Sequence, residues 1–271
     1  MRYLSIFLTA IILSSACQTR TPEKYDNAML NSVLWVQYAA EYKAATLQAY
    51  STAKNSLDVA IEDKQWTAAV EQTTGYQTLP PAIIVDVDET VLDNSPYDAR
   101  LITSGKAYNS DTWAAWCKEM RAKAVPGALD FCRYAHDKGI TVFYVTNRRE
   151  PLKLATRTNL QGLGFPLRTD METVIPKTHT SNKGERRAAI AGNFRILLLI
   201  GDNAGDFYSG FTNASLVKRD ALVSKYVQYF GTKWIVLPNP MYGNWESALF
   251  EYNSGLSKED KNRIKYEKLM D

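Results

Sequence analysis

Hydrophobic residues form four short runs along the chain, at residues 82–85, 140–145, 196–200 and 234–237, interrupted only by Thr141 in the second. These runs are rich in β-branched residues and are bounded by turn-forming residues, a pattern typical of strands. Strands that are apolar at every position are buried on both faces, as in parallel sheets covered by helices. The sequence therefore predicts an α/β fold with a three-layer, Rossmann-like parallel sheet.

Elsewhere, apolar residues recur at steps of three and four, which indicates helices. Residues 23–70 show this pattern and predict an N-terminal helical segment that precedes the sheet. Further helices are expected between the strands, at residues 128–138, 152–163 and 183–191. The polar segment at about 97–123 separates the first two strands and contains Trp113 and Trp116. We expect it to form a small inserted cap over the site.

Residues 1–17 have the layout of an export signal, with a basic residue near the start and an apolar run over residues 6–13. The run is too short to span a bilayer. Small residues before Cys17 resemble a bacterial lipobox, in which Cys17 becomes the lipidated first residue of the mature chain, and residues 18–271 are expected to form one domain. Cleavage without lipidation and a buried N-terminal helix are the alternatives. We expect an exported protein, either an outer-membrane lipoprotein, which Gln18 favours, or a periplasmic one.

Composition narrows the class of protein. The 271 residues are 45% hydrophobic, enough to bury a full core, and 32 basic against 29 acidic residues give a net charge of only +3. Such a balance provides no large field of one sign, so binding to a nucleic acid polymer is not predicted. Cys117 and Cys132 remain after export; whether they pair stays open, and neither shows the spacing of a zinc site.

Two carboxylates come directly after the first predicted strand, in the segment Asp86-Val87-Asp88. Carboxylates separated by one residue at a strand end can act as nucleophile and general acid. A single aspartate at that place is more often a helix cap or turn residue. The functional interpretation therefore depends on the residues at the ends of the later strands.

Polar residues occur at the ends of those strands as well. Thr146-Asn147-Arg148 offers a hydroxyl and backbone amides to a phosphoryl oxygen, and Lys183 begins a helix-like segment where its charge can meet a phosphate. Asp202 and Asp206 lie in an acidic loop that suits a hard, oxygen-liganded cation. Taken alone, the first segment is more often a turn or helix cap and the lysine a solvated side chain, and the acidic loop is an ordinary turn about as often as a metal site. Because ligands bind beyond the carboxyl ends of parallel strands, their shared position predicts one site.

The order Asp-x-Asp, Thr, Lys, Asp-x-x-x-Asp resembles the haloacid dehalogenase superfamily of phosphatases. Within it, the chain is similar to the class C nonspecific acid phosphatases, the bacterial lipoprotein type, over nearly the whole mature chain. The segments that carry this similarity are Leu34-Trp35-Val36-Gln37, Asp88-Glu89-Thr90, Asn94-Ser95-Pro96-Tyr97, Ala124-Val125-Pro126-Gly127-Ala128, Phe143-Tyr144-Val145-Thr146-Asn147-Arg148, Gly201-Asp202-Asn203, Leu237-Pro238-Asn239 and Tyr242-Gly243.

This resemblance implies a Mg²⁺-dependent phosphomonoesterase. Asp86 is implied as the nucleophile that forms an aspartyl-phosphate, and Asp88 as the general acid and base. Thr146 and Lys183 are implied to orient the phosphoryl oxygens. The implied metal ligands are the carboxylates of Asp86 and Asp202, the backbone carbonyl of Asp88, and Asp206 directly or through water.

The resemblance also implies where the substrate binds. Trp113 and Tyr242 are the expected aromatic walls for a nucleobase or aryl group, with Asn147 and Arg148 as further substrate contacts. The expected partners are a small phosphomonoester, such as a 5′-nucleotide, and the membrane through the lipid anchor. Trp116 fits core packing better than substrate contact, and a homo-oligomer stays open.

Two other functions remain as alternatives. A response-regulator receiver domain also combines acids, a threonine and a lysine on a parallel sheet, but its acids lie on early strands and an export signal does not suit it. A non-catalytic surface lipoprotein that binds a ligand is the second alternative, although the presence of both Asp86 and Asp88 speaks against it. The sequence has no Cys-x5-Arg or Gly-x4-Gly-Lys-Ser/Thr phosphate loop.

Overall fold

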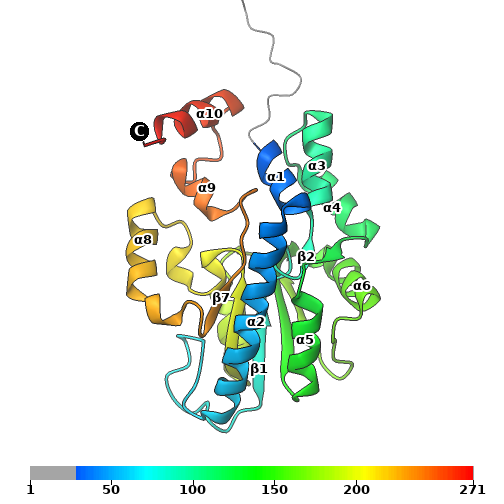
Figure 1. The fold of residues 1–271 in the computed structure, drawn as a ribbon, viewed down its shortest axis with the longest axis vertical. Helices are drawn as coiled ribbons and strands as arrows, with labels where there is room; N and C mark the ends of the chain where they lie inside the picture. Colours follow the sequence, from blue (N-terminus) through cyan, green and yellow to red (C-terminus); the bar gives the residue numbers. More distant parts are fainter. Residues whose placement is uncertain (1–28, 271) are drawn as a thin grey trace, which may run out of the picture.

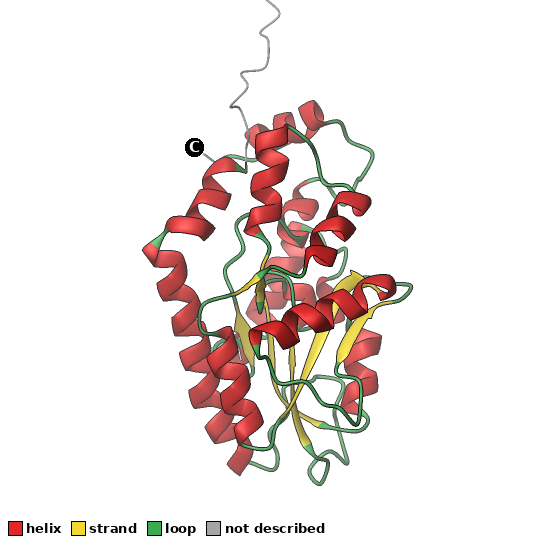
Figure 2. Cartoon of the chain, turned by 90° about the vertical axis from the view of Figure 1, so that its right-hand side faces the viewer, coloured by secondary structure: helices red, strands yellow, loops and turns green. Residues whose placement is uncertain are grey.

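Five parallel strands form the central sheet of the computed structural model, which describes residues 29–270. Their order across the sheet is β5-β4-β1-β6-β7. Their bounds are β1 Pro81–Val85, β4 Thr141–Arg149, β5 Val174–Lys177, β6 Arg195–Gly201 and β7 Trp234–Val236. Helices lie on both sides of the sheet (Figure 2). The predicted three-layer α/β fold is therefore confirmed.

The N-terminal helical segment consists of two helices, α1 (Leu30–Tyr38) and α2 (Ala40–Glu62). The sequence predicts one continuous segment over 23–70, and this is wrong in two respects. Ala39 adopts an extended backbone that separates the helices, and the second helix ends at Glu62. Residues 23–28 of the prediction lie outside the described part of the chain.

The other helices follow the predicted alternation with the strands. They are α3 Ser95–Ser104, α4 Ser110–Glu119, α5 Ala128–Asp137, α6 Lys153–Leu163, α7 Gly184–Ala191, α8 Leu216–Lys225, α9 Asn244–Leu249 and α10 Lys258–Glu267. In Figure 1, α2 and α5 lie side by side on one face of the sheet. The three helices expected between strands are confirmed, as α5, α6 and α7.

The alternation of side chains along β1 divides the core into two clusters. Ile83 and Val85 pack with residues of α2 and α5, whereas Ala82 and Ile84 pack with residues of α7 on the other face. All four of these side chains are 5% exposed or less. The central strand is therefore buried on both faces, which explains why its sequence is apolar at every position.

Two strands differ from the prediction. The short edge strand β5 was missed, because its sequence Val-Ile-Pro-Lys contains a proline, which is confined to edges and strand ends. Strand β4 continues four residues beyond the predicted end at 145, so Thr146-Asn147-Arg148 lies within the strand and not in a turn after it. The alternation of the strand buries Thr146 and Arg148 and exposes Asn147.

An insertion between β1 and α5 contains α3 and α4, at the upper right of Figure 1. A short antiparallel ribbon closes its base, where β2 (Leu92–Asp93) pairs with β3 (Lys123–Ala124). The side chain of Asn109 caps α4 by accepting from two backbone N–H groups. These elements cover the segment where the sequence predicts a cap, and the role of this segment as a cap stays a prediction.

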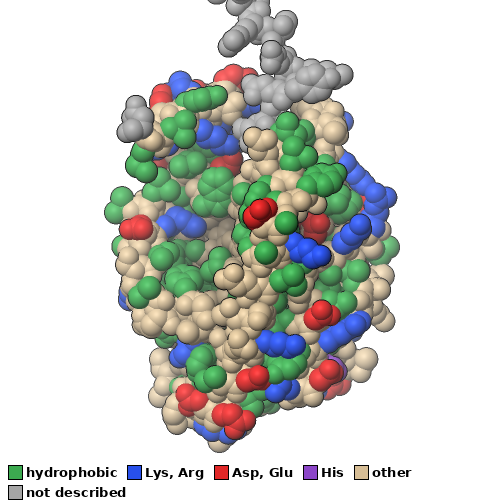
Figure 3. All heavy atoms as spheres, viewed as in Figure 1, with side chains coloured by type: hydrophobic (Ala, Val, Ile, Leu, Met, Phe, Trp, Pro, Cys, Tyr) green, Lys and Arg blue, Asp and Glu red, His purple; other side chains and the backbone are tan. Residues whose placement is uncertain are grey.

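The surface in Figure 3 shows basic and acidic side chains interspersed over one face, in keeping with the near-balanced charge. Cys117 and Cys132 are both buried and free, so these two cysteines do not form a disulfide. Burial raises the pKa of each thiol to about 12. Between residues 29 and 270, no helix is both long and apolar enough to cross a membrane.

Candidate active site

Asp86 lies immediately after β1 and is held by the neighbouring strand. Its N–H donates to the carbonyl of Ile200 in β6 (2.9 Å), and its side chain is largely buried. Lys183, the residue before α7, forms ion pairs with Asp86 and, at 2.7 Å, with Asp206. Lys183 is only 5% exposed, so the interpretation of a solvated lysine does not hold. The structure thus joins three predicted site residues in one buried contact.

Three carboxylates of the site converge at the carboxyl ends of β1 and β6. Asp86, Asp202 and Asp206 each present one oxygen, and these oxygens lie within 4.8 Å of one another. Asn239 fixes Asp202 by donating to its Oδ2 at 2.8 Å. A Cβ atom at Gly201 would lie 2.3 Å from Oδ2 of Asp206, so this close approach requires glycine. The chain is therefore built to bring these acids together.

The electrostatics of the cluster fit a bound cation. Burial raises the pKa of Asp86 to about 7 despite the opposing charge of Lys183, and burial together with Asp86 raises the pKa of Asp202 well above its usual range. Burial lowers the pKa of Lys183, but Asp206 and Asp86 more than offset this and leave it above the usual value. Three carboxylates share one ammonium group. An oxygen-liganded divalent ion would supply the positive charge that the cluster lacks.

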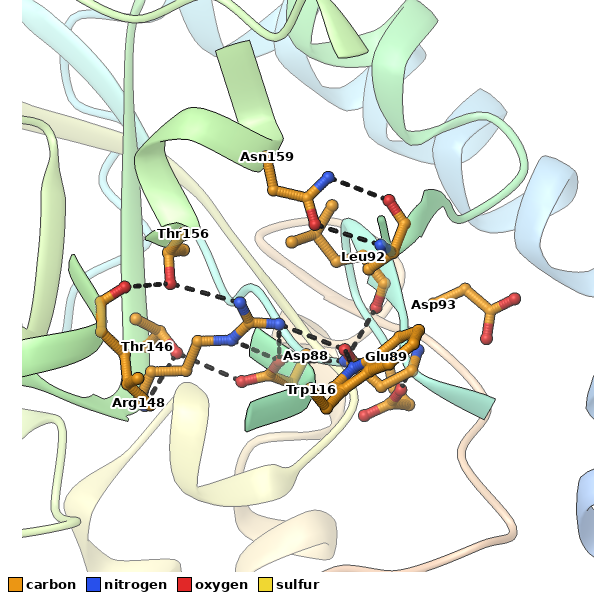
Figure 4. Close-up of polar contacts among 12 residues, drawn as sticks. Asp88, Glu89, Leu92, Asp93, Trp116, Thr146, Arg148, Thr156 and Asn159 are labelled. Atoms are coloured by element: carbon orange, nitrogen blue, oxygen red, sulfur yellow. Dashed lines mark hydrogen bonds and ion pairs between the residues drawn. The ribbon is translucent and has the colours of Figure 1, made fainter. Parts of the chain in front are cut away.

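Asp88 belongs to a second polar network, drawn in Figure 4. Its Oδ1 accepts from Nε of Arg148 (2.9 Å) and from Nδ2 of Asn94 (2.9 Å), and Nη2 of Arg148 forms an ion pair with it at 2.8 Å. Its Oδ2 accepts from the hydroxyl of Thr146 at 3.3 Å. The sequence placed Thr146 and Arg148 near Asp88, but it gave no role to Asn94. The structure therefore adds the buried amide of Asn94 to the residues predicted around Asp88.

The turn after Asp88 is conformationally restrained. Glu89 has a φ of 59°, in the left-handed region that few residues other than glycine adopt, and its side chain is 2% exposed. The Glu89 carboxylate accepts from the N–H of Asn94 at 2.8 Å. Trp116 donates from Nε1 to Oδ1 of Asn94 at 2.8 Å. Trp116 is thus a core residue, as expected, and supports the loop that carries Asp88.

Arg186 is a residue at the site that the sequence analysis missed. Its guanidinium donates to the carbonyl of Thr146 (2.6 Å) and to Oδ1 of Asn147 (2.7 Å). It therefore joins the end of β4 to the start of α7, which Lys183 precedes. The signal was the basic pair that begins three residues after Lys183, but a pair of arginines on a helix is more often solvated.

The two expected aromatic walls lie on different parts of the fold. Trp113 in α4 packs edge-to-face on Tyr97, with ring centres 5.1 Å apart, and lies 5.5 Å from the guanidinium carbon of Arg148. Tyr242, in the loop before α9, packs on the cluster that includes Tyr42 of α2. The structure thus places Trp113 beside the Asp88 network. Cys17, the predicted lipidation site, lies outside the described residues.

The comparisons with known proteins agree with this geometry. Residues 11–245 match the family model of the HAD superfamily, subfamily IIIB (Acid phosphatase). The class C acid phosphatase from Bacillus anthracis superposes with a TM-score of 0.80 at 35% sequence identity, over 90% of this chain and 97% of that one. A second structure of the Bacillus protein, with tungstate bound, gives the same values.

A curated relative is more distant and is covered only in part. Acid phosphatase 1 from Solanum lycopersicum is 30% identical over 167 residues, which are 59% of this chain. The match spans 57% of the tomato protein. The family model, by contrast, spans most of this chain and includes Asp86, Lys183 and Asp202. The chain belongs to subfamily IIIB, the acid phosphatases, of the HAD superfamily.

Proposed function

We propose that the chain hydrolyses phosphomonoesters in two steps, with Asp86 as the nucleophile. The observation that carries this proposal is the cluster of Asp86, Asp202 and Asp206 at the carboxyl ends of adjacent strands, with buried Lys183 paired to Asp86 and Asp206. The Bacillus relative binds tungstate, a tetrahedral oxyanion like phosphate. Family membership and the geometry of the cluster support the same chemistry.

In the first step, a carboxylate oxygen of Asp86 attacks phosphorus in line. The bond from phosphorus to the ester oxygen breaks, and Asp88 gives its proton to the leaving alkoxide. In the second step, Asp88 takes a proton from water, the water oxygen bonds to phosphorus, and the Asp86–phosphorus bond breaks. Phosphate leaves, and both aspartates return to their starting forms. One difficult displacement is thereby replaced by two easier ones.

The surrounding donors orient the phosphoryl group. Lys183 places its ammonium against Asp86, where it opposes the negative charge of the phosphoryl oxygens. Thr146 and Asn147, at the end of β4, offer a hydroxyl and an exposed amide. These groups are the proposed phosphate contacts of the chain itself.

Mg²⁺ is the proposed metal. The residues that would hold it are Asp86, Asp202, Asp206 and the backbone carbonyl of Asp88, and when bound it supplies positive charge to the phosphoryl oxygens. The three converging carboxylates fit an ion that prefers oxygen ligands. The test is phosphate release with Mg²⁺ and with EDTA, which we expect to abolish turnover.

The proposed substrates are 5′-nucleotides or related aryl phosphates, with Trp113 and Tyr242 as stacking walls. Stacking of a base on an aromatic side chain is worth about 1–3 kcal/mol. Trp113→Ala should therefore lower kcat/KM for a nucleoside monophosphate about tenfold or more relative to a small alkyl phosphate. Equal losses for both substrates would exclude a stacking role for Trp113.

We further propose that the chain is exported and anchored to the outer membrane by a lipid on Cys17, with a periplasmic protein as the alternative. The support is the signal-like sequence of residues 1–17. Metabolic labelling with a fatty acid should tag the wild type and leave Cys17→Ser untagged. Labelling of both proteins alike would contradict acylation at this residue.

The first experiment for the activity is phosphate release by the purified chain from nucleoside monophosphates and p-nitrophenyl phosphate. We expect turnover that needs Mg²⁺ and disappears in Asp86→Asn. If the folded protein binds Mg²⁺ but releases phosphate from no phosphomonoester, the ligand-binding lipoprotein becomes the better description.

A further inference from the structure

Arg148 commits its guanidinium to groups of the protein. Nε donates to Oδ1 of Asp88, Nη2 forms an ion pair with the same oxygen and donates to Oδ1 of Asn94 (3.1 Å), and Nη1 donates to the hydroxyl of Thr156 in α6 (3.2 Å). The side chain is only 2% exposed. Figure 4 shows it reaching from β4 toward Asp88 and Thr156. All three nitrogens are thus engaged, and we assign Arg148 a role other than the direct substrate contact expected from the sequence.

The orientation of the Asn94 amide is fixed by its partners. Its Oδ1 accepts from Nε1 of Trp116 and from Arg148, both of which can only donate at these atoms. Rotation of the amide by 180° would turn its own NH₂ group toward both donors. Nδ2 therefore has to face Asp88, to which it donates at 2.9 Å. Asn94 is fully buried, so water cannot substitute for these partners.

Together these residues leave the two oxygens of Asp88 in different surroundings. Oδ1 accepts one hydrogen bond each from Arg148 and Asn94 and also forms the ion pair with Nη2 of Arg148, whereas Oδ2 accepts, among residues 29–270, only the longer bond from Thr146. A proton on Oδ1 would face the two hydrogen-bond donors and the guanidinium nitrogen of the ion pair, so the proton is favoured on the other oxygen. Oδ2 is therefore the oxygen left to exchange a proton with a leaving group.

We propose that Asn94 and Arg148 are positioning residues that hold Asp88 with Oδ2 turned toward the leaving oxygen of the substrate. This inference rests on the proposed function, in which Asp88 is the general acid. The arrangement matters because proton transfer requires hydrogen-bond distance and alignment, and a misplacement of about one ångström at a reacting group can cost roughly a hundredfold in rate. Trp116 contributes indirectly, because it fixes the Asn94 amide.

The test compares leaving groups that need protonation to different degrees. An alkyl phosphate expels a strongly basic alkoxide and depends on the general acid, whereas p-nitrophenyl phosphate expels a stable phenolate and depends on it little. The variants are Arg148→Lys, which keeps the charge and removes the planar fork, and Asn94→Ala. Arg149→Lys, the same change at the next and exposed residue of β4, is the matched control. The measured quantity is kcat/KM for each substrate, because it reports formation of the phosphoenzyme.

We expect Arg148→Lys and Asn94→Ala to lower kcat/KM for the alkyl phosphate at least about tenfold more than for p-nitrophenyl phosphate, since general acid catalysis is worth about 10²–10⁴-fold. Arg149→Lys should leave the ratio of the two values as in the wild type. A purely structural role would lower both values alike, so equal losses, or no losses, would overturn the inference.

Two further results keep the outcomes distinct. Thermal unfolding shows whether each variant folds, and if Arg148→Lys does not, Trp116→Phe decides in its place, because it removes the Nε1 donor without touching Asp88. Trp116→Phe should change the ratio in the same direction. A wild type that hydrolyses neither substrate would remove the proposed function itself, and with it this inference. A wild type that hydrolyses both, with ratios unchanged in the variants, would overturn the inference alone.

Discussion

Asp86 and Asp98 are both buried aspartates whose pKa lies at about 7, yet their surroundings differ. Burial raises the pKa of Asp86, and the positive charge of Lys183, with which Asp86 forms an ion pair, opposes this rise. Burial and the nearby charge of Asp93 raise the pKa of Asp98 in α3, and its Oδ2 has no hydrogen-bond partner within residues 29–270. Asp86 is thus paired with a cation and accompanied by further acids, whereas Asp98 faces only a negative charge.

This difference shows that burial alone does not make an aspartate a catalytic group. A nucleophile must be ionised, and an adjacent cation favours the ionised form. Asp86 has Lys183 in contact and two further carboxylates within reach of a shared ion. Asp98 has a negative neighbour in its place. The comparison therefore supports the proposed role of Asp86 as the nucleophile, and it predicts a cost in stability at Asp98.

The largest expected effect is on turnover. Asp86→Asn should lower kcat by about 10⁴-fold or more, as is found when a nucleophile is removed. Asp98→Asn makes the same change from acid to amide outside the cluster and should keep wild-type turnover. Phosphate release under saturating substrate measures both. Comparable losses in the two variants would show that burial, not the partner set, decides which aspartate matters.

The second effect is on stability, and here Asp98→Asn is expected to be the more stable protein at high pH. Because the folded pKa of Asp98 exceeds its usual 3.8, the native chain holds a proton that the unfolded chain loses between about pH 4 and pH 7. Asp98 makes its full contribution to the free energy of unfolding below about pH 4, and this contribution is lost as the pH rises to about 7. The difference in free energy of unfolding between Asp98→Asn and the wild type should therefore shift in favour of the variant by up to about 4 kcal/mol from pH 4 to pH 8. Urea unfolding at both pH values measures this gain, and an equal effect at both would contradict it.

The smallest effect concerns the metal. A ligand that binds only the folded state stabilises it by about 2.7 kcal/mol at a hundredfold excess over its Kd. Mg²⁺ should therefore raise the Tm of the wild type and of Asp98→Asn alike, and should raise that of Asp202→Asn much less. Thermal unfolding with and without Mg²⁺ measures this without relying on activity. The same rise in all three proteins would place the ion elsewhere.

The sequence predicted the sheet because its central strands are buried on both faces and are therefore apolar over most of their length. It did not predict the break at Ala39, because alanine favours helices and only tertiary packing can override that preference. It also missed β5, an edge strand of four residues that contains a proline. The local sequence pattern was thus sufficient to predict strands that are buried on both faces. It was insufficient for elements whose conformation depends on contacts between distant segments.

The same distinction applies to the site. Asp86, Asp202 and Lys183 were predicted because each lies beside a strand end or a helix start, which sequence spacing reveals. Asn94 and Arg186 act through contacts between separate elements. Asn94 accepts from Trp116, 22 residues further along the chain, and Arg186 donates to Thr146, 40 residues before it. No spacing rule reports such contacts, so these roles required the folded chain.

The central claim is that phosphate is transferred to Asp86. The most direct measurement is to quench the enzyme in acid during turnover, digest it, and locate the bound phosphoryl group by mass spectrometry. We predict a phosphorylated peptide that contains Asp86 and is missing from Asp86→Asn. Phosphate on another residue, or an enzyme that turns over without any phosphorylated intermediate, would contradict the account.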